Sequence, residues 1–242
     1  MPDKQIEKKK PGRGFWLTLV VIIVLIPVTV GISRYLGDRN YYIASVLIMI
    51  YSMMPFFAGF ESRKPQAREL VTLAVMCAIA VAARAAFVWA PNFKPIGGIV
   101  VVTAMAFGPQ AGFMTGSLSL IASDMLYGQG PWTPWQMFSF GILGFIAGLL
   151  ARKGILTEEK PLVAAIVSFF MMVLIVGPIL DTYTVFMMAQ RMTAEAIIGV
   201  YLAGLPVNIS QGVAVFLCVL LLTKPLMSKL NRIKVKYGMI EQ

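Results

Sequence analysis

The chain has 242 residues, of which 58% are apolar and only 13% are charged, and its mean hydropathy is +0.79. A soluble domain carries nearer a quarter of charged residues. Several apolar runs also reach about 18 residues or more, the length that a transmembrane helix needs. These features exclude an ordinary soluble domain and predict an all-α integral membrane protein.

The net charge of +10 is carried by short clusters of Lys and Arg beside the apolar runs. This distribution is typical of the cytoplasmic flanks of membrane spans and argues against nucleic-acid binding. The chain contains no histidine, which removes the commonest general base and the commonest metal ligand. Cys77 and Cys218 both fall inside apolar runs, so a structural disulfide is not expected.

In chain order, hydropathy predicts a basic tail, two N-terminal transmembrane helices, a bundle of six more and a second basic tail. The tails cover residues 1–13 and 224–242, the first pair of helices lies within 14–61, and the bundle lies within 62–223. The expected spans are approximately 15–32, 42–60, 70–89, 97–107, 111–126, 136–151, 162–180 and 196–222. The fourth is short for a bilayer and needs either neighbouring protein around its ends or a locally thinned membrane.

Two features near the C-terminus interrupt this pattern. Residues 181–195 are polar enough to form a loop or an interfacial helix. Pro206 is expected to kink the last span, or to end one of two half-helices, because proline removes a backbone hydrogen bond.

The positive-inside rule orients the chain. When the N-terminal tail lies in the cytoplasm, sixteen of the 21 Lys and Arg residues fall in cytoplasmic segments and four in external loops, the remaining one being Arg84 within a span. The opposite orientation would put the large majority outside. We therefore expect both termini in the cytoplasm, and the loops around Lys94 and Trp132 on the external face.

The third span carries Ala74, Ala78 and Ala82 at four-residue spacing. Small residues at this spacing let another helix backbone approach closely, which is how helices associate in lipid. The spacing alone leaves open whether the approaching helix belongs to this chain or to a partner. Gly141, Gly144 and Gly148 form a similar stripe, for which packing within the chain is the favoured interpretation.

Charged groups inside a membrane are costly and mark functional sites by default. Arg84 and Asp124 both lie near the external ends of their spans, so they can form an ion pair. The alternatives are that this pair is structural, that Arg84 extends outward to water, or that the two residues contact a ligand.

The segment from Tyr127 to Gln136 reads YGQGPWTPWQ. An aromatic belt at the membrane interface accounts for one Trp, but not for two Trp interleaved with two Pro and flanked by two Gln. Stiff prolines, aromatic faces and amides suit a large, flat, partly polar ligand. The candidate ligand-binding residues are Arg84, Asn92, Phe93, Lys94, Asp124, Tyr127, Gln129, Trp132, Trp135, Gln136, Tyr201 and Asn208. The last two surround Pro206, where packing at a kink is the alternative.

Motifs for catalysis are missing from the sequence. It has no G-x-x-x-x-G-K-[ST] for ATP phosphates, no H-E-x-x-H, no G-x-S-x-G and no Cys/His set spaced for a metal. The sequence therefore predicts no catalytic residue, no metal site and no ATPase activity of its own.

Residues 69–222 resemble the substrate-binding S component of energy-coupling factor (ECF) vitamin transporters. The resemblance rests on ARELVTLAVMCAIAVAARAA, FKPIGGIVVVTAMAFGPQAGFMTGSLS and GQGPWTPWQMFSFGILGFIAGLL. It implies a six-helix S-component bundle, to which this chain adds two N-terminal helices. The GQGPWTPWQMF loop looks most like that of the cobalamin-specific members.

The resemblance implies a multi-pass protein of a prokaryotic plasma membrane that captures cobalamin or a related corrinoid externally. It would dock on a transmembrane coupling subunit, and two partner ATPases would bind ATP. The family pattern assigns Ala74, Ala78 and Ala82 to that docking face. Cobalamin would be the transported ligand, and the chain would have no cofactor of its own. The alternatives are a queuosine precursor, riboflavin or pantothenate as substrate, an accessory membrane protein that binds a partner without a ligand, and a membrane enzyme.

Overall fold

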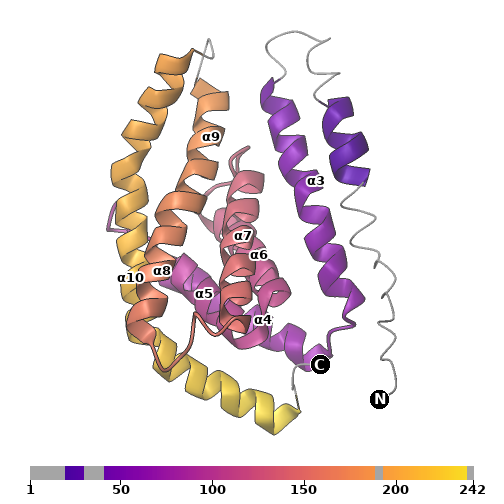
Figure 1. Ribbon diagram of the computed structural model, residues 1–242, viewed down its shortest axis with the longest axis vertical. Helices are drawn as coiled ribbons and strands as arrows, with labels where there is room; N and C mark the ends of the chain where they lie inside the picture. The colour runs from indigo at the N-terminus through magenta and orange to yellow at the C-terminus, as the bar shows by residue number, and fades with distance from the viewer. Residues whose placement is uncertain (1–19, 30–40, 189–192, 239–242) are drawn as a thin grey trace, which may run out of the picture.

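The computed structural model describes residues 20–29, 41–188 and 193–238. Every regular element within these residues is a helix, which confirms the predicted all-α class. The elements are η1 (Val21–Leu25), α3 (Tyr41–Ser62), α4 (Ala67–Ala86), α5 (Ile96–Phe107), α6 (Pro109–Tyr127), α7 (Thr133–Arg152), α8 (Pro161–Met171), η3 (Met172–Val176), α9 (Gly177–Met188) and α10 (Ala194–Tyr237). In Figure 1 the helices α5, α6 and α7 lie between α3 on one side and α8 to α10 on the other.

Five of the described helices are long and apolar enough to cross a membrane: residues 43–62, 67–86, 133–152, 161–187 and 194–237. The helix α5 is apolar but has only 12 residues. The first predicted span is described only for residues 20–29, and the first external loop and residues 189–192 lie outside the described residues.

The short helix α5 forms the centre of the bundle. All of its residues except Met105 are buried, and α4, α6, α7 and α10 pack around it. Of the two alternatives for so short a span, the described residues show the first, neighbouring protein around the helix. Gly98 allows the close approach of α10, because an added Cβ there would meet the Cβ and Sγ of Cys218 at 2.5 Å.

The helices α6 and α7 are in backbone contact through glycines. A Cβ added at Gly112 would meet the backbone of Gly144, and one added at Gly148 would meet the backbone of Pro109 at the start of α6. The glycine stripe of α7 therefore serves packing within the chain, as its spacing indicated. Small residues that let helix backbones approach are the usual means of association in a bilayer.

One prediction near the C-terminus is corrected in part. Residues 181–188 were expected to be a loop or an interfacial helix, but they continue the preceding helix, which runs through α8, η3 and α9 to Met188. The turn widens to a π-helix over Met172–Val176, just before Gly177 and Pro178. Pro178 has no N–H to donate to the preceding turn, and a widened turn accommodates that loss.

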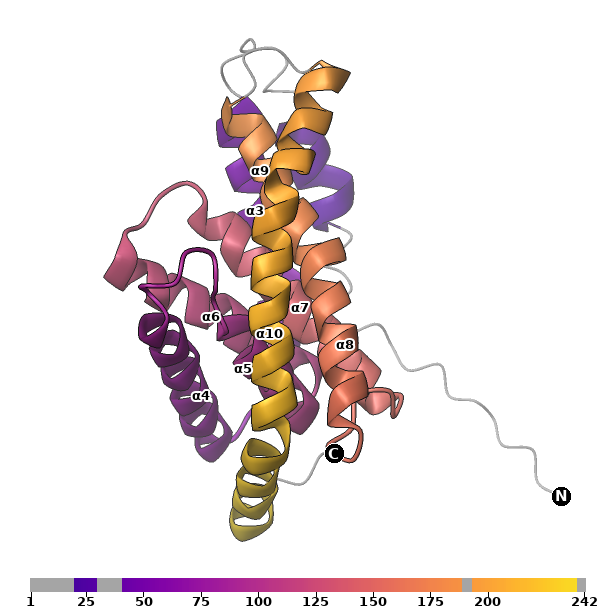
Figure 2. The same ribbon diagram turned by 90° about the vertical axis from the view of Figure 1, so that its left-hand side faces the viewer.

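The last helix, α10, is one helix of 44 residues that contains both Pro206 and Pro225. Pro206 therefore does not separate two half-helices, and it lies on an exposed face of α10. The helix also continues to Tyr237, beyond the predicted end near 222 and into the predicted basic tail. Figure 2 shows its last turns bending away from the main axis of the helix.

The N-terminal helix α3 packs on the bundle, against α6, α7 and α9. The ring of Phe56 stacks on that of Phe113 in α6, with centroids 4.2 Å apart and planes 6° apart. Phe57 meets Phe113 edge-on at 5.9 Å, and Phe56 also contacts Phe145 of α7. Because Phe113 is fully buried, α3 is part of the packed structure.

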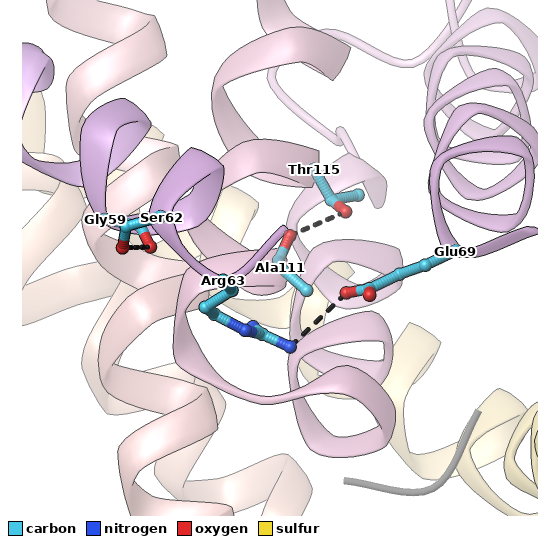
Figure 3. A network of polar contacts seen from close by, with 6 residues as sticks. All are labelled: Gly59, Ser62, Arg63, Glu69, Ala111 and Thr115. Carbon is cyan, nitrogen blue, oxygen red and sulfur yellow. Dashed lines mark hydrogen bonds and ion pairs between the residues drawn. The ribbon is translucent and has the colours of Figure 1, made fainter. Parts of the chain in front are cut away.

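One end of the bundle gathers the basic segments. Arg68 at the start of α4 donates to the carbonyl of Tyr237 at 3.0 Å, and Lys234 lies 5.2 Å from the ring of Phe107. The loop that joins α3 to α4 is closed at the same end by an ion pair between Arg63 and Glu69, 3.4 Å long (Figure 3). These contacts bring the ends of α3, α5 and α10 together with the start of α4.

Candidate ligand-binding site at the opposite end of the bundle

The loop between α4 and α5 folds into successive turns at the end away from the basic segments. The N–H of Ala90 donates to the carbonyl of Phe87 at 3.0 Å, and the N–H of Phe93 donates to that of Ala90 at 3.3 Å. Asn92 follows Pro91 and has a φ of 60°, which asparagine tolerates better than most residues and which suits the third position of a type II turn. The ring of Phe93 packs on that of Phe87, with centroids 5.0 Å apart.

A cavity of about 260 Å³ lies beneath this loop. Four of the predicted ligand-binding residues line it, from α4, the loop and the end of α6: Arg84, Asn92, Lys94 and Tyr127. The remaining lining residues come from the same loop and were not predicted: Phe87, Val88, Ala90 and Pro91. The cavity therefore combines two cationic side chains, an amide, a phenol and an apolar wall.

Arg84 and Asp124 form the ion pair that their positions made possible. The Arg84 guanidinium donates to Asp124 Oδ1 at 3.1 Å, and the hydroxyl of Thr133 donates to Oδ2 at 2.8 Å. The backbone N–H of Gly130 donates in turn to Thr133 Oγ1 at 3.4 Å. Asp124 is 1% exposed, so both of its oxygens are engaged inside the protein, and α4 is joined through α6 to the loop that precedes α7.

The other face of Arg84 is turned to the cavity. Its guanidinium carbon lies 5.2 Å from the centre of the Tyr127 ring, within the range of a cation–π contact. Lys94 is half-buried at the cavity wall. Burial lowers the pKa of the Lys94 amine, and the positive charge of Arg84 lowers it further, while Asp124 partly opposes the shift. The cavity is thus an environment in which a positive charge is poorly solvated.

The two tryptophans of the α6–α7 loop have different surroundings. Trp132 is 37% exposed, and its ring lies so close to Gly130 that a Cβ there would meet ring atoms. Trp135 is 3% exposed and packs beside Tyr183 and Phe186 of α9 at centroid distances of 6.1 and 6.0 Å. Its indole N–H has no hydrogen-bond acceptor among the described residues. Neither Trp lines the cavity beneath the Lys94 loop.

The two glutamines of this loop also lie outside the lining of that cavity. Gln129 is exposed, and Gln136 is partly buried in the first turn of α7. Of the residues from Tyr127 to Gln136, only Tyr127 lines this cavity.

Tyr201 and Asn208 belong to a second polar group, between α9 and α10. The side-chain amide of Asn208 donates to Asp181 Oδ2 at 2.8 Å, and the hydroxyls of Tyr201 and Thr182 are 2.7 Å apart. Two glycines make this pairing possible. A Cβ at Gly177 would meet the Asn208 side chain, and one at Gly204 would meet the Asp181 carboxylate.

Eight of the twelve predicted residues fall into two groups, and Phe93, Gln129, Trp132 and Gln136 belong to neither. Arg84, Asn92, Lys94, Asp124 and Tyr127 meet around one cavity. Tyr201 and Asn208 are bonded to α9, against which Trp135 also packs. Their hydrogen-bond partners Thr133, Thr182 and Asp181 were not among the predicted site residues. The sequence does not show which helices are adjacent, so these contacts become visible only in the structure.

Ala74, Ala78 and Ala82 lie on the exposed side of α4. The opposite side of the helix carries its buried residues, Leu73, Met76, Cys77 and Ala80, and packs on α5 and α6. Figure 2 shows α4 at the edge of the bundle. The alanine ladder is thus not used for packing against the described residues of the chain.

Comparison with known proteins identifies the family. The family model described as ECF-type riboflavin transporter, S component, matches residues 64–228. A UPF0397 protein of Aliivibrio fischeri is 27% identical over 86 residues, which is 33% of this chain and 46% of that protein. A UPF0397 protein of Clostridium perfringens is 33% identical over 61 residues, or 25% of this chain and 32% of that protein.

These alignments span less than half the length of the curated relatives. No solved structure matches the chain. The family match, by contrast, covers the helices from α4 into α10, including both groups of polar residues. The chain therefore belongs to the family of ECF-type riboflavin transporter S components.

Proposed function

We propose that this chain captures a vitamin or vitamin precursor in the cavity lined by Arg84, Asn92, Lys94 and Tyr127, for ATP-driven import by partner subunits. The observation that carries the proposal is the position of this cavity, at the end of α4 opposite to the basic segment around Arg68. Under the positive-inside rule the basic end is cytoplasmic, so the cavity opens on the external side, where an importer meets its substrate.

Cobalamin or a related corrinoid is the first candidate substrate, on the strength of the GQGPWTPWQMF loop. Riboflavin is the second, and two observations favour it. The matching family is described as a riboflavin transporter component. A cavity of about 260 Å³ is also near the lower end of ligand sites, roughly 300 to 1,000 Å³, so a corrinoid would require the bounding loops to move apart.

The partners in this proposal are a transmembrane coupling subunit and two ATPases, which bind the ATP. The exposed ladder of Ala74, Ala78 and Ala82 is the proposed docking face for the coupling subunit, because small side chains let a foreign helix approach the backbone of α4. Both termini would then lie in the cytoplasm of a prokaryotic cell, beside the ATPases.

Uptake by whole cells tests this function. Cells that lack their own uptake route and express the coupling subunit and ATPases would be given labelled cobalamin or labelled riboflavin, with and without this chain. The proposal predicts that accumulation of one of the two requires both the chain and ATP hydrolysis. Accumulation of neither, with all subunits present in the membrane, would argue for the accessory-protein alternative.

A further inference from the structure

We infer that the cavity recognises an anionic oxygen group, a phosphate or a carboxylate, on the transported molecule, and that Lys94 is the residue that selects it. The inference rests on the proposed function, because it specifies which ligands the same cavity accepts. Its basis is that the cavity is lined by Arg84, which has a paired carboxylate, and by Lys94, which has none among the described residues.

Arg84 and Lys94 bring two positive charges to the cavity, and one of them is already neutralised. Asp124 pairs with Arg84 at 3.1 Å and uses its second oxygen to accept from Thr133. At 1% exposure it has no surface left for a ligand. The Asp124 carboxylate therefore neutralises the positive charge of Arg84 within the protein.

Lys94 has no such partner in the described part of the chain. The ion pairs found there are Arg63 with Glu69 and Arg84 with Asp124, and neither includes Lys94. The residue is nevertheless partly buried, and it lies near the positive charge of Arg84 and near the Asp124 carboxylate, which is already paired with Arg84. A partly desolvated ammonium group without a counter-ion is costly, and a bound anion would remove that cost.

Anionic lipid headgroups also carry an anionic oxygen group that Lys94 could bind. Val88, Trp89 and Leu126 are between 67% and 76% exposed beside the cavity, so lipid can reach its rim. A lysine that serves a headgroup usually extends along the surface towards water. Lys94 instead lines the cavity together with Asn92 and Tyr127, so we assign the anion to the transported molecule.

Matched ligand pairs test the inference with the full chain in phosphatidylcholine nanodiscs. Each of two pairs differs in an anionic group: riboflavin 5′-phosphate against riboflavin, and pantothenate against pantothenol. Cobalamin is also compared with cobinamide, which lacks the phosphodiester together with the ribose and base of the nucleotide loop. We expect at least one anionic member to bind roughly 10- to 100-fold more tightly than its counterpart, as removal of a charged hydrogen bond predicts.

The variant Lys94→Gln should abolish this preference, and Lys94→Arg should keep it, because the charge is retained. Lys153→Gln, at an exposed lysine of the opposite end, is the matched control and should bind like the wild type. The Lys94→Arg protein also shows whether a loss in Lys94→Gln comes from the charge or from misfolding.

Three outcomes would overturn the inference. They are equal or tighter binding of the uncharged members, a preference that survives in Lys94→Gln, and no binding by any anionic member. A fourth concerns the source: if phosphatidylglycerol competes with the ligand in the wild type but not in Lys94→Gln, the anion is a lipid headgroup. The two proposals can fail separately. If an uncharged member binds tightly and is taken up, and Lys94→Gln changes neither, the proposed function is supported and this inference is wrong.

Discussion

Arg84 and Asp124 join α4 to α6 by an ion pair of 3.1 Å at the wall of the cavity. Ala82, two residues before Arg84, lies on the exposed side of the same helix. Residues two apart in an α-helix point about 200° away from each other. The helix α4 therefore presents its small-residue ladder outward and its charged residue to the cavity, which brings the proposed docking face and the proposed ligand site onto one rigid element.

The variant Asp124→Asn tests the ion pair. It leaves the Arg84 charge without its counter-ion in a largely buried position, and loss of one partner of a buried pair costs about 3 to 5 kcal/mol. We expect a lower thermal unfolding temperature in detergent. The double variant Arg84→Met with Asp124→Leu removes both charges and should recover much of the loss. Equal stability of Asp124→Asn and the wild type would show that the pair contributes little.

The variant Ala78→Leu tests the docking face. A bulky side chain there keeps α5 and α6 packed as before, because Ala78 is exposed, but it holds a foreign helix away from the backbone of α4. We expect co-purification with the coupling subunit to fall at least tenfold, with ligand affinity unchanged. Ala203→Leu, at an exposed alanine of α10, is the control. Normal assembly of Ala78→Leu would remove the ladder from the interface.

The variant Trp132→Ala tests the loop before α7. The ring covers Gly130, whose N–H is bonded to Thr133 and so is linked to Asp124. Without the ring, the turn that positions Thr133 loses its cover, so we expect ligand affinity to fall about fivefold, or roughly 1 kcal/mol. Trp89→Ala, at a 76% exposed tryptophan, should have a smaller effect. An unchanged affinity in Trp132→Ala would separate this loop from the site.

The pH dependence of binding follows from Lys94. Its pKa is lowered by burial and by Arg84, so the amine loses its proton at a lower pH than an ordinary lysine. Affinity for an anionic ligand should be highest below that pKa and should fall as the pH rises through it. Lys94→Arg should bind independently of pH over the same range, because arginine stays protonated. A pH-independent wild type would contradict the assignment to Lys94.

The same shift has a consequence for folding. Lys94 binds its proton less tightly in the folded protein than in the unfolded chain, so the unfolded state holds more protons. The contribution of this residue to the free energy of unfolding therefore rises as the pH increases from the lowered pKa towards 10.5, the ordinary value.

The variant Phe56→Ala tests the role of α3. It removes the ring stacked on Phe113 at 4.2 Å, which costs about 0.5 to 1.5 kcal/mol beyond the loss of buried area. We expect protease cleavage in the segment after α3 to become faster. Met54→Ala, on the same helix but 41% exposed, is the control. Equal cleavage of the two variants would mean that α3 is held by other contacts.

Most of the fold could be predicted because hydropathy directly reports which segments avoid water. The short span at α5 was predicted from its length, and the glycine stripe of α7 was predicted to serve packing within the chain, which the structure confirms. The extent of the helices near the C-terminus was less predictable. Asp181 looks like a loop residue in the sequence, but the Asn208 amide satisfies its carboxylate inside the bundle, and such a partner is 27 residues away in the chain.

The candidate site was predicted in part for a similar reason. The ion pair between Arg84 and Asp124 could be anticipated, because both lie near the same end of their helices. The surroundings of the two tryptophans could not, because the turn into α7 directs Trp135 to Tyr183 and Phe186 while Trp132 covers Gly130. Hydropathy carries no information about the direction in which a loop residue points.

Native mass spectrometry of the purified protein tests the central claim most directly. The wild type should release one small molecule per chain on denaturation, after growth in medium that contains cobalamin, riboflavin and pantothenate. The variant Ala90→Trp, which fills the cavity from the α4–α5 loop, should fold and carry none. A wild type without bound ligand in this medium, or an Ala90→Trp protein that retains it, would contradict the assignment of this cavity as the substrate site.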